Sequence, residues 1–288
     1  MMLIHQPDIN GTHAELNQPI SFVTEAALKE FMTIGIFGPN TSFTIKKVAA
    51  NLRGLANGLY ITELGVAVYE ADATTLVNYH PLSESEKQAI GEAFNTVGAL
   101  IQTAGFFPKF EGNHNQGSSV YIHPTINDQS AEKLLARHFY VERTTRNAPE
   151  FARWLASKST VLGLVEFSLL SGDVKNLPQA FDGLQMAYDS GGTIFVTPHG
   201  VNKRTTFEDM LDGYYHHRPD ESVSIAGDSP PTDGSLFEIP DIRKIAVANP
   251  ILLDIGRQVT GETYFAPTPA GAAVILQGLT HGFLKNAS

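Results

Sequence analysis

The chain has 288 residues, a formal net charge of −10, and 42% hydrophobic and 17% charged residues, proportions typical of a folded rather than a disordered protein. The acidic balance argues against a sequence-independent grip on nucleic acid or on an anionic membrane, which needs clustered Lys and Arg, so we expect neither as a partner. The absence of cysteine excludes a disulfide framework, a thiolate nucleophile and a Cys-based zinc site.

The N-terminus carries no targeting pattern. Residues 1–10 lack a basic stretch followed by a long apolar core, so we expect no signal peptide. The longest apolar run, at 161–170, is interrupted by Glu166 and is too short to span a bilayer. These features predict a cytoplasmic protein.

The first part of the chain alternates between strand and helix patterns. The predicted strands are residues 2–6, 33–37 and 59–62, with a hairpin arm at 65–69. The predicted helices are residues 24–32, with Thr24 as N-cap, and 43–55. This alternation predicts a parallel sheet with crossover helices.

The pattern changes after residue 81. Ser83 to Thr103 reads as one long helix that starts with a capping box formed by Ser83 and Glu86. The elements expected next are a polar stretch at 111–117, a strand at 119–123, a helix at 130–139, the apolar run at 161–170, a helix at 177–188 and a strand at 193–197. We interpret 82–199 as an α+β unit inserted into a sheet domain made of 1–81 and 200–288.

From Lys203 onward the parallel pattern returns. Helices are predicted at 205–214, 251–260 and 270–284, and strands at 223–226 and 245–248.

Four short segments that each follow an apolar run carry the chemistry. They are residues 8–12, 38–42, 201–203 and 227–233. In an open parallel sheet, ligands bind beyond the carboxyl ends of the strands. A carboxylate such as Asp8 can attack phosphorus there and form an aspartyl-phosphate, once a cation screens its charge. Asp228 and Asp233 offer the hard oxygen ligands that suit Mg²⁺.

Each segment taken alone also fits a simpler interpretation. Residues 7–11 can be an Asx-type turn, and 227–233 a Pro-rich turn with two solvated aspartates. Lys203 can be a solvated lysine at a helix start. Only the order of the segments along the chain favours a common site.

In that order the segments resemble the motifs of the haloacid-dehalogenase (HAD) superfamily of phosphohydrolases. The stretch from Val247 to Leu279 is similar to that of the capped IIB type, such as sucrose-phosphate and mannosyl-phosphoglycerate phosphatases. The resemblance implies a HAD-like α/β fold, with a parallel-sheet Rossmannoid core and an inserted α+β cap. It also implies Mg²⁺-dependent hydrolysis of a small phosphorylated substrate, with a sugar phosphate as the expected class.

The resemblance also implies roles for single residues. Asp8 would be the nucleophile and a metal ligand, Lys203 the charge stabiliser, Asp228 a metal ligand, and Asp233 a ligand or a neighbouring acid. Asn10 stands where the family has its acid/base aspartate, and its backbone carbonyl would still bind the metal. The substrate-binding candidates are Gly11, Thr12, Gly38, Asn40, Thr41, Ser42, Asn202 and His114, the last in a polar loop at 111–116 of the inserted unit.

Two departures from the family pattern stand out. Gly38 falls at a position where relatives carry a hydroxyl, which Thr41 or Ser42 would replace if the loop bulges. Asn10 cannot donate or accept a proton, and loss of general acid–base catalysis typically costs about 10² to 10⁴ in rate.

Four explanations of Asn10 are open. The protein can be a slow phosphatase, or a catalytically weak relative that binds a phosphorylated ligand or a partner. Asn10 can also be an engineered substitution. Finally, the Asn10-Gly11 pair can deamidate and restore an aspartate.

Overall fold

The computed structural model describes residues 3–15, 18–108, 118–135, 141–157, 162–169, 184–188, 193–220 and 222–287. It divides into two compact units, of which unit 1 comprises Met1–Val77 and Asn202–Ser288, and unit 2 comprises Asn78–Val201. Unit 2 therefore begins four residues before the predicted residue 82 and ends two residues after the predicted residue 199. In the described part of the chain, no helix has the length and apolar character needed to cross a membrane.

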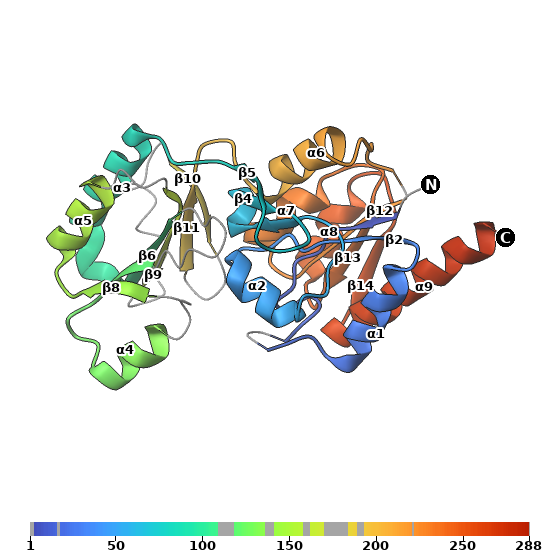
Figure 1. The fold of residues 1–288 in the computed structure, drawn as a ribbon, viewed down its shortest axis with the longest axis horizontal. Helices are drawn as coiled ribbons and strands as arrows, with labels where there is room; N and C mark the ends of the chain where they lie inside the picture. Colours follow the sequence, from blue (N-terminus) through green and yellow to red (C-terminus); the bar gives the residue numbers. More distant parts are fainter. Residues whose placement is uncertain are drawn as a thin grey trace. The chain divides into compact units, whose positions relative to one another are not determined.

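Unit 1 is built on a five-stranded parallel sheet (Figure 1). Its strands, in spatial order, are β14 (Thr263–Ala266), β13 (Arg243–Val247), β12 (Val223–Gly227), β1 (Leu3–His5) and β2 (Gly35–Phe37). Residues of β1 and β12 are buried throughout, as expected for central strands that are covered on both faces.

Helices cover both faces of this sheet. On one face, Ile4 and Ile225 pack with apolar residues of α6 (Lys203–Gly213), α7 (Pro230–Phe237) and α8 (Pro250–Arg257). On the other face, Ala226 and Ile245 pack with α9 (Pro269–Ala287), which lies against α1 (Phe22–Phe31). Alternate residues of one strand thus serve the two layers of the core.

The third predicted strand leaves the parallel sheet. β3 (Tyr60–Thr62) belongs to a separate sheet with β4 (Ala67–Tyr69) and β5 (Leu76–Tyr79), and pairs with β4 antiparallel. The prediction of a third parallel strand is therefore wrong. Pro39 has no N–H to donate to a ladder, and only a single parallel bridge, between Asn40 and Ile61, joins β3 to the segment after β2. This bridge places the carboxyl end of β3 at the same edge as that of β2.

The helices before and after β2 differ slightly from their predicted limits. α1 is capped by Ser21 rather than Thr24, because the Thr24 N–H donates to Ser21 Oγ at 3.2 Å. The second helix, α2 (Ile45–Leu52), is shorter than the predicted 43–55 at both ends.

Unit 2 is built on a six-stranded sheet in the order β10-β11-β9-β6-β7-β8. The strands are β6 (Ile101–Pro108), β7 (Ser118–Ile122), β8 (Val141–Thr145), β9 (Leu162–Leu169), β10 (Gln185–Tyr188) and β11 (Thr193–Thr197). Neighbours pair antiparallel except for β7 and β8. Helices α3 (Glu84–Val97) and α5 (Ala148–Ser157) pack on one face through Phe94 and Phe151, whereas α4 (Asp128–Leu135) packs with Val120 and Ile122.

Two helix predictions in unit 2 are wrong. The helix that begins at the capping box of Ser83 and Glu86 ends at Val97, because a short 3₁₀ turn at Gly98–Leu100 leads into β6. Of the helix predicted at 177–188, residues 184–188 are described, and there Gln185–Tyr188 forms strand β10, which pairs with β11. Pairing with a neighbouring strand overrides the local helical pattern in this case.

Candidate active site

Asp8 lies just beyond β1, at the carboxyl edge of the parallel sheet. Its backbone N–H donates to the carbonyl of Ala226 at 2.8 Å, which continues the contact between β1 and β12. Its side chain is 10% exposed, and its Oδ1 lies 3.2 Å from Nζ of Lys203. Burial raises the pKa of Asp8 to about 6, since the opposing effect of Lys203 is only partial and Asp233 adds to the rise.

Lys203 is the first residue of α6 and is fixed by the cap of that helix. The side-chain oxygen of Asn202 accepts from the N–H groups of Arg204 and Thr205, at 2.9 and 3.0 Å. Burial alone would lower the pKa of Lys203, but the carboxylates of Asp233 and Asp8 raise it above its ordinary value. Lys203 is therefore a buried, permanently charged cation beside Asp8.

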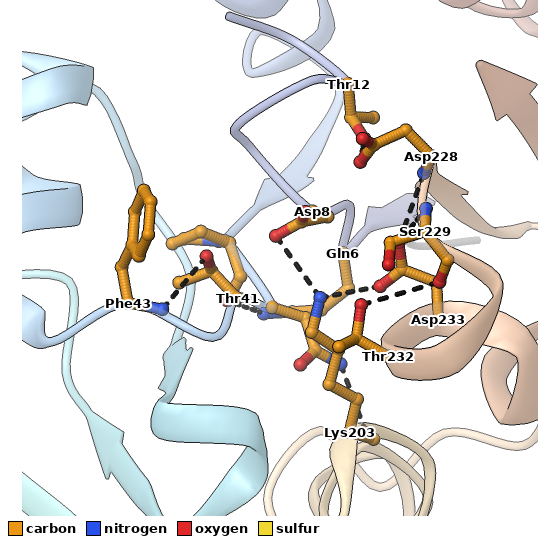
Figure 2. A network of polar contacts seen from close by, with 12 residues as sticks. Gln6, Asp8, Thr12, Thr41, Phe43, Lys203, Asp228, Ser229, Thr232 and Asp233 are labelled. Atoms are coloured by element: carbon orange, nitrogen blue, oxygen red, sulfur yellow. Dashed lines mark hydrogen bonds and ion pairs between the residues drawn. The ribbon is translucent and has the colours of Figure 1, made fainter. Parts of the chain in front are cut away.

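Asp233, in the first turn of α7, holds Lys203 and the preceding loop. Its Oδ1 accepts from Lys203 Nζ at 2.6 Å, and both side chains are at most 1% exposed. Its Oδ2 accepts from the N–H groups of Asp228 and Ser229, each at 3.1 Å (Figure 2). Gly227 allows this approach, because an added Cβ would lie 2.8 Å from Asp233 Oδ2.

Asp228 is joined to the loop that follows β1. Its Oδ1 accepts from Thr12 Oγ1 at 3.1 Å. Gly11 has a φ of +80°, and an added Cβ there would collide with Asp228 Oδ2. Burial raises the pKa of Asp228 to about 8, with further contributions from the charges of Asp8 and Asp233. Gly11 and Thr12 thus hold Asp228 against the loop that follows β1. Figure 2 shows the side chains of Asp8, Thr12 and Asp228.

The three aspartates form a candidate cation site. Asp8, Asp228 and Asp233 each offer a carboxylate oxygen, and these oxygens lie within 4.8 Å of one another. The three carboxylates share one lysine, and their mutual repulsion contributes to the raised pKa values of Asp8 and Asp228. A divalent cation would relieve this repulsion, and a set of carboxylate oxygens is the ligand type that Mg²⁺ prefers. The residues present therefore fit the metal that the sequence predicts.

No protein-family model matches the sequence, and no curated protein matches it significantly. Solved structures match over almost the whole chain. A HAD/COF-like hydrolase from Plasmodium vivax has a TM-score of 0.74 at 16% identity, covering 98% of this chain and 96% of that one. A HAD subclass IIB sugar phosphatase has a TM-score of 0.72 at 14% identity, with coverages of 98% and 100%. A haloacid dehalogenase-like hydrolase from B. subtilis has a TM-score of 0.71 at 14% identity, with coverages of 96% and 99%.

The chain has the HAD fold. Its predicted fold class, a parallel α/β core with an inserted α+β unit, is thereby confirmed. Identities of 14–16% establish the fold alone, so the activity has to be argued from the site.

Asn10 lies in the first loop of this HAD core and is only 7% exposed. Its side-chain oxygen accepts from Nδ2 of Asn51, in α2, at 3.4 Å. An amide at this position can hydrogen-bond but cannot transfer a proton. Asn10 therefore lies two residues after Asp8, but its amide cannot act as an acid.

The segment after β2 offers Thr41 rather than Gly38 as a hydroxyl group. A Cβ at Gly38 would collide with the carbonyl oxygen of Leu59, so this backbone excludes a hydroxyl side chain at position 38. Thr41 is 1% exposed, and its Oγ1 accepts from the N–H of Phe43 at 3.3 Å (Figure 2). Ser42 is half-buried.

The other predicted substrate-binding residues have different surroundings. Asn40 is buried, and its Nδ2 donates to the backbone carbonyl of Lys203 at 3.1 Å, which ties the second loop to α6. Asn202 caps α6. His114 and the loop at 111–116 lie outside the described residues.

Gln6 contributes to the site framework and was not predicted from the sequence. Its Nε2 donates to the carbonyl oxygens of Pro39 and Leu59, at 2.9 and 2.8 Å, and so fixes the loop after β2. The available signal was a polar residue at the end of the predicted strand 2–6, directly after His5.

Proposed function

We propose that this protein is a Mg²⁺-dependent phosphomonoester hydrolase that acts on a small phosphorylated metabolite, a sugar phosphate, through an aspartyl-phosphate at Asp8. The observation that carries the proposal is the 3.2 Å contact between Asp8 and the buried cation of Lys203, at the edge of the sheet where three carboxylates converge. One structural neighbour is a sugar phosphatase, which supports the choice of substrate class.

Each residue has a definite part in this reaction. With a pKa of about 6, Asp8 is mostly ionised at pH 7 and can attack phosphorus. Lys203 stays charged and neutralises the phosphate, and Asp233 keeps its ammonium group in place.

Asp8, Asp228 and the backbone carbonyl of Asn10 would hold Mg²⁺, with Asp233 beside them. The ion would screen the charges of nucleophile and phosphate. Thr41 is the hydroxyl best placed to bind a phosphate oxygen.

The test is a phosphatase assay with p-nitrophenyl phosphate and a panel of sugar phosphates. We expect turnover that requires Mg²⁺, is lost on chelation and returns when the metal is restored. A folded protein that hydrolyses neither class of substrate in Mg²⁺ would contradict the proposal.

Asn10 favours a second candidate, a HAD-fold protein that binds a phosphorylated ligand or a partner with little or no turnover. It predicts calorimetric binding of a sugar phosphate in Mg²⁺ without release of inorganic phosphate. The two measurements together separate the candidates.

A further inference from the structure

An alkyl phosphate such as a sugar phosphate leaves as an alkoxide, which is too basic to depart without a proton. The site described above offers no obvious donor for that proton. Asp8 is the nucleophile, and Asn10 is an amide. Asp228 would be a ligand of Mg²⁺, and Asp233 already accepts hydrogen bonds from Lys203 and from two backbone N–H groups. If the protein hydrolyses sugar phosphates, another acid is required.

Glu63 follows β3 directly, in a short 3₁₀ turn at Glu63–Gly65. This turn is hydrogen-bonded to the loop that carries Thr41. The N–H of Glu63 donates to the carbonyl of Phe43, and the N–H of Leu64 to the carbonyl of Thr41, each at 3.1 Å. Because the bridge between Asn40 and Ile61 is parallel, the turn lies at the carboxyl edge where Asp8 also lies.

The same turn contacts the start of α6, which carries Lys203. Thr206 Oγ1 donates to the carbonyl of Gly65 at 2.9 Å. A Cβ on Gly65 would come within 2.6 Å of Thr206 Oγ1, so the turn packs tightly against the helix. Glu63 is therefore held by the elements that bring Thr41 and Lys203 into the site.

Glu63 is a largely buried acidic residue. The residue is 5% exposed, and its side chain makes no hydrogen bond or ion pair with any residue that the structure describes. Burial raises the pKa of Glu63 to about 8, so the group is mostly protonated at pH 7. Glu63 and Leu64 also adopt φ angles of 53° and 59°, a left-handed conformation that is unfavourable for both residue types. Unpaired buried groups and strained backbone are features that folds retain at functional sites.

We propose that Glu63 is the general acid–base of this site, an inference that rests on the proposed phosphatase function. Asp8 attacks phosphorus, the bond from phosphorus to the leaving oxygen breaks, and Glu63 gives its proton to that oxygen, which departs as an alcohol. Water then attacks the aspartyl-phosphate and loses a proton to the Glu63 carboxylate. The products are inorganic phosphate, the free Asp8 carboxylate and protonated Glu63.

The test compares two leaving groups in wild type and Glu63→Gln. Glucose 6-phosphate leaves as an alkoxide and needs the proton, whereas p-nitrophenolate is stable without it. We expect Glu63→Gln to lower kcat on glucose 6-phosphate by about 10²-fold or more, and on p-nitrophenyl phosphate by less than about tenfold. Glu70→Gln is the matched control, because Glu70 hydrogen-bonds to Tyr214 on the surface and should leave both rates unchanged.

A second arm uses position 10. In an Asn10→Asp background a carboxyl group is restored in the first loop, so Glu63→Gln should then cost less than about tenfold on glucose 6-phosphate. Two results in Glu63→Gln would overturn the inference: equal losses on both substrates, or no loss on either. A loss that is just as large in the Asn10→Asp background would overturn it too. If Glu63→Gln fails to fold, Glu63→Met carries the same expectations.

Failure of the proposed phosphatase function gives a different result from failure of the Glu63 inference. In that case wild type hydrolyses neither substrate, whereas failure of the Glu63 inference leaves wild-type turnover intact and removes only its selective dependence on position 63.

Discussion

Two buried polar clusters lie along β1, and they differ in charge: one contains a charged lysine among carboxylates, and the other is a pair of neutral histidines. At the carboxyl end, Asp8 and its two partner aspartates remain around a charged lysine, Lys203. Nearer the strand itself, His5 and His13 form a pair with their Nε2 atoms 2.9 Å apart, and both side chains are fully buried. His5 Nδ1 lies 2.8 Å from Ser224 Oγ, and the rings of Phe31 and Phe37 pack on His5.

The two clusters differ in charge because only the first contains an opposite charge in contact with its titratable groups. Burial lowers the pKa of His5 well below its ordinary value and that of His13 to about 4, so both rings are neutral at pH 7. Among the residues that the structure describes, no carboxylate contributes to the pKa of either ring. Of these two clusters, only the one in which an opposite charge touches the buried groups keeps a charge. The surplus of carboxylates over lysine in the first cluster supports the proposed cation site there.

The strongest test of this contrast removes the nucleophile. We expect Asp8→Asn to lower kcat on p-nitrophenyl phosphate by about 10⁴-fold or more, because no other group forms the covalent intermediate. Its melting temperature should equal or exceed that of wild type, since the variant replaces a buried carboxyl with an amide of similar shape. Turnover near the wild-type rate would refute the nucleophile assignment.

Removing the lysine should break the charge balance itself. Lys203→Met leaves Asp8 and Asp233 uncompensated, and we expect a loss of about 3–5 kcal/mol in the free energy of unfolding at pH 7. The loss should shrink at pH 5, because the Asp8 carboxylate, whose pKa burial raises to about 6, takes up a proton there. Urea titrations at the two pH values measure both effects.

Lys244→Met is the matched control for this experiment. Lys244 is also buried, but its Nζ donates to the carbonyl oxygens of Ile242 and Thr260, at 3.1 Å each, instead of to carboxylates. Its cost should not shrink at pH 5. If the loss of unfolding free energy in Lys244→Met shrinks at pH 5 as much as the loss in Lys203→Met, the carboxylate explanation is wrong.

Adding an acid beside the nucleophile should sharpen the contrast. In the Glu63→Gln background, which lacks the proposed acid, we expect Asn10→Asp to raise kcat on a sugar phosphate at least tenfold, while Mg²⁺ affinity hardly changes because the backbone carbonyl is retained. The lower end of the usual gain from general acid–base catalysis is about 10², and imperfect positioning reduces it. Intact mass must be recorded, because deamidation of Asn10 mimics the variant. An unchanged rate would show that a carboxyl group at position 10 does not act as an acid in this site.

The smallest effect concerns the histidine pair. Both pKa values are lowered in the folded state, so protons bind the unfolded chain first and stability falls as the pH drops below about 6.5. Each histidine adds about 1.4 kcal/mol per pH unit to that slope. From pH 6.5 to 5, His13→Leu should therefore lose about 1–2 kcal/mol less than wild type. Above pH 7 the two pH dependences should coincide, and a persistent difference there would assign the effect to another group.

Local pattern in the sequence was enough for much of the framework. Apolar runs ending at Asp8 and at Asp228 predicted strands whose ends meet at one edge, and the capping box of Ser83 and Glu86 correctly placed a helix start. These features depend on residues a few positions apart, so short-range preferences determine them. The order of the segments then sufficed to indicate the fold class.

Tertiary structure decided what depends on distant residues. Strand β3 leaves the parallel sheet because of Pro39, residues 185–188 become a strand because β11 pairs with them, and Gly38 is fixed by the carbonyl of Leu59. Nothing near Glu63 in the sequence reveals that this residue is largely buried. Nor does any local pattern show that His5 meets Ser224, 219 residues away. Burial and pairing depend on which distant segments pack together, and local propensity does not determine this.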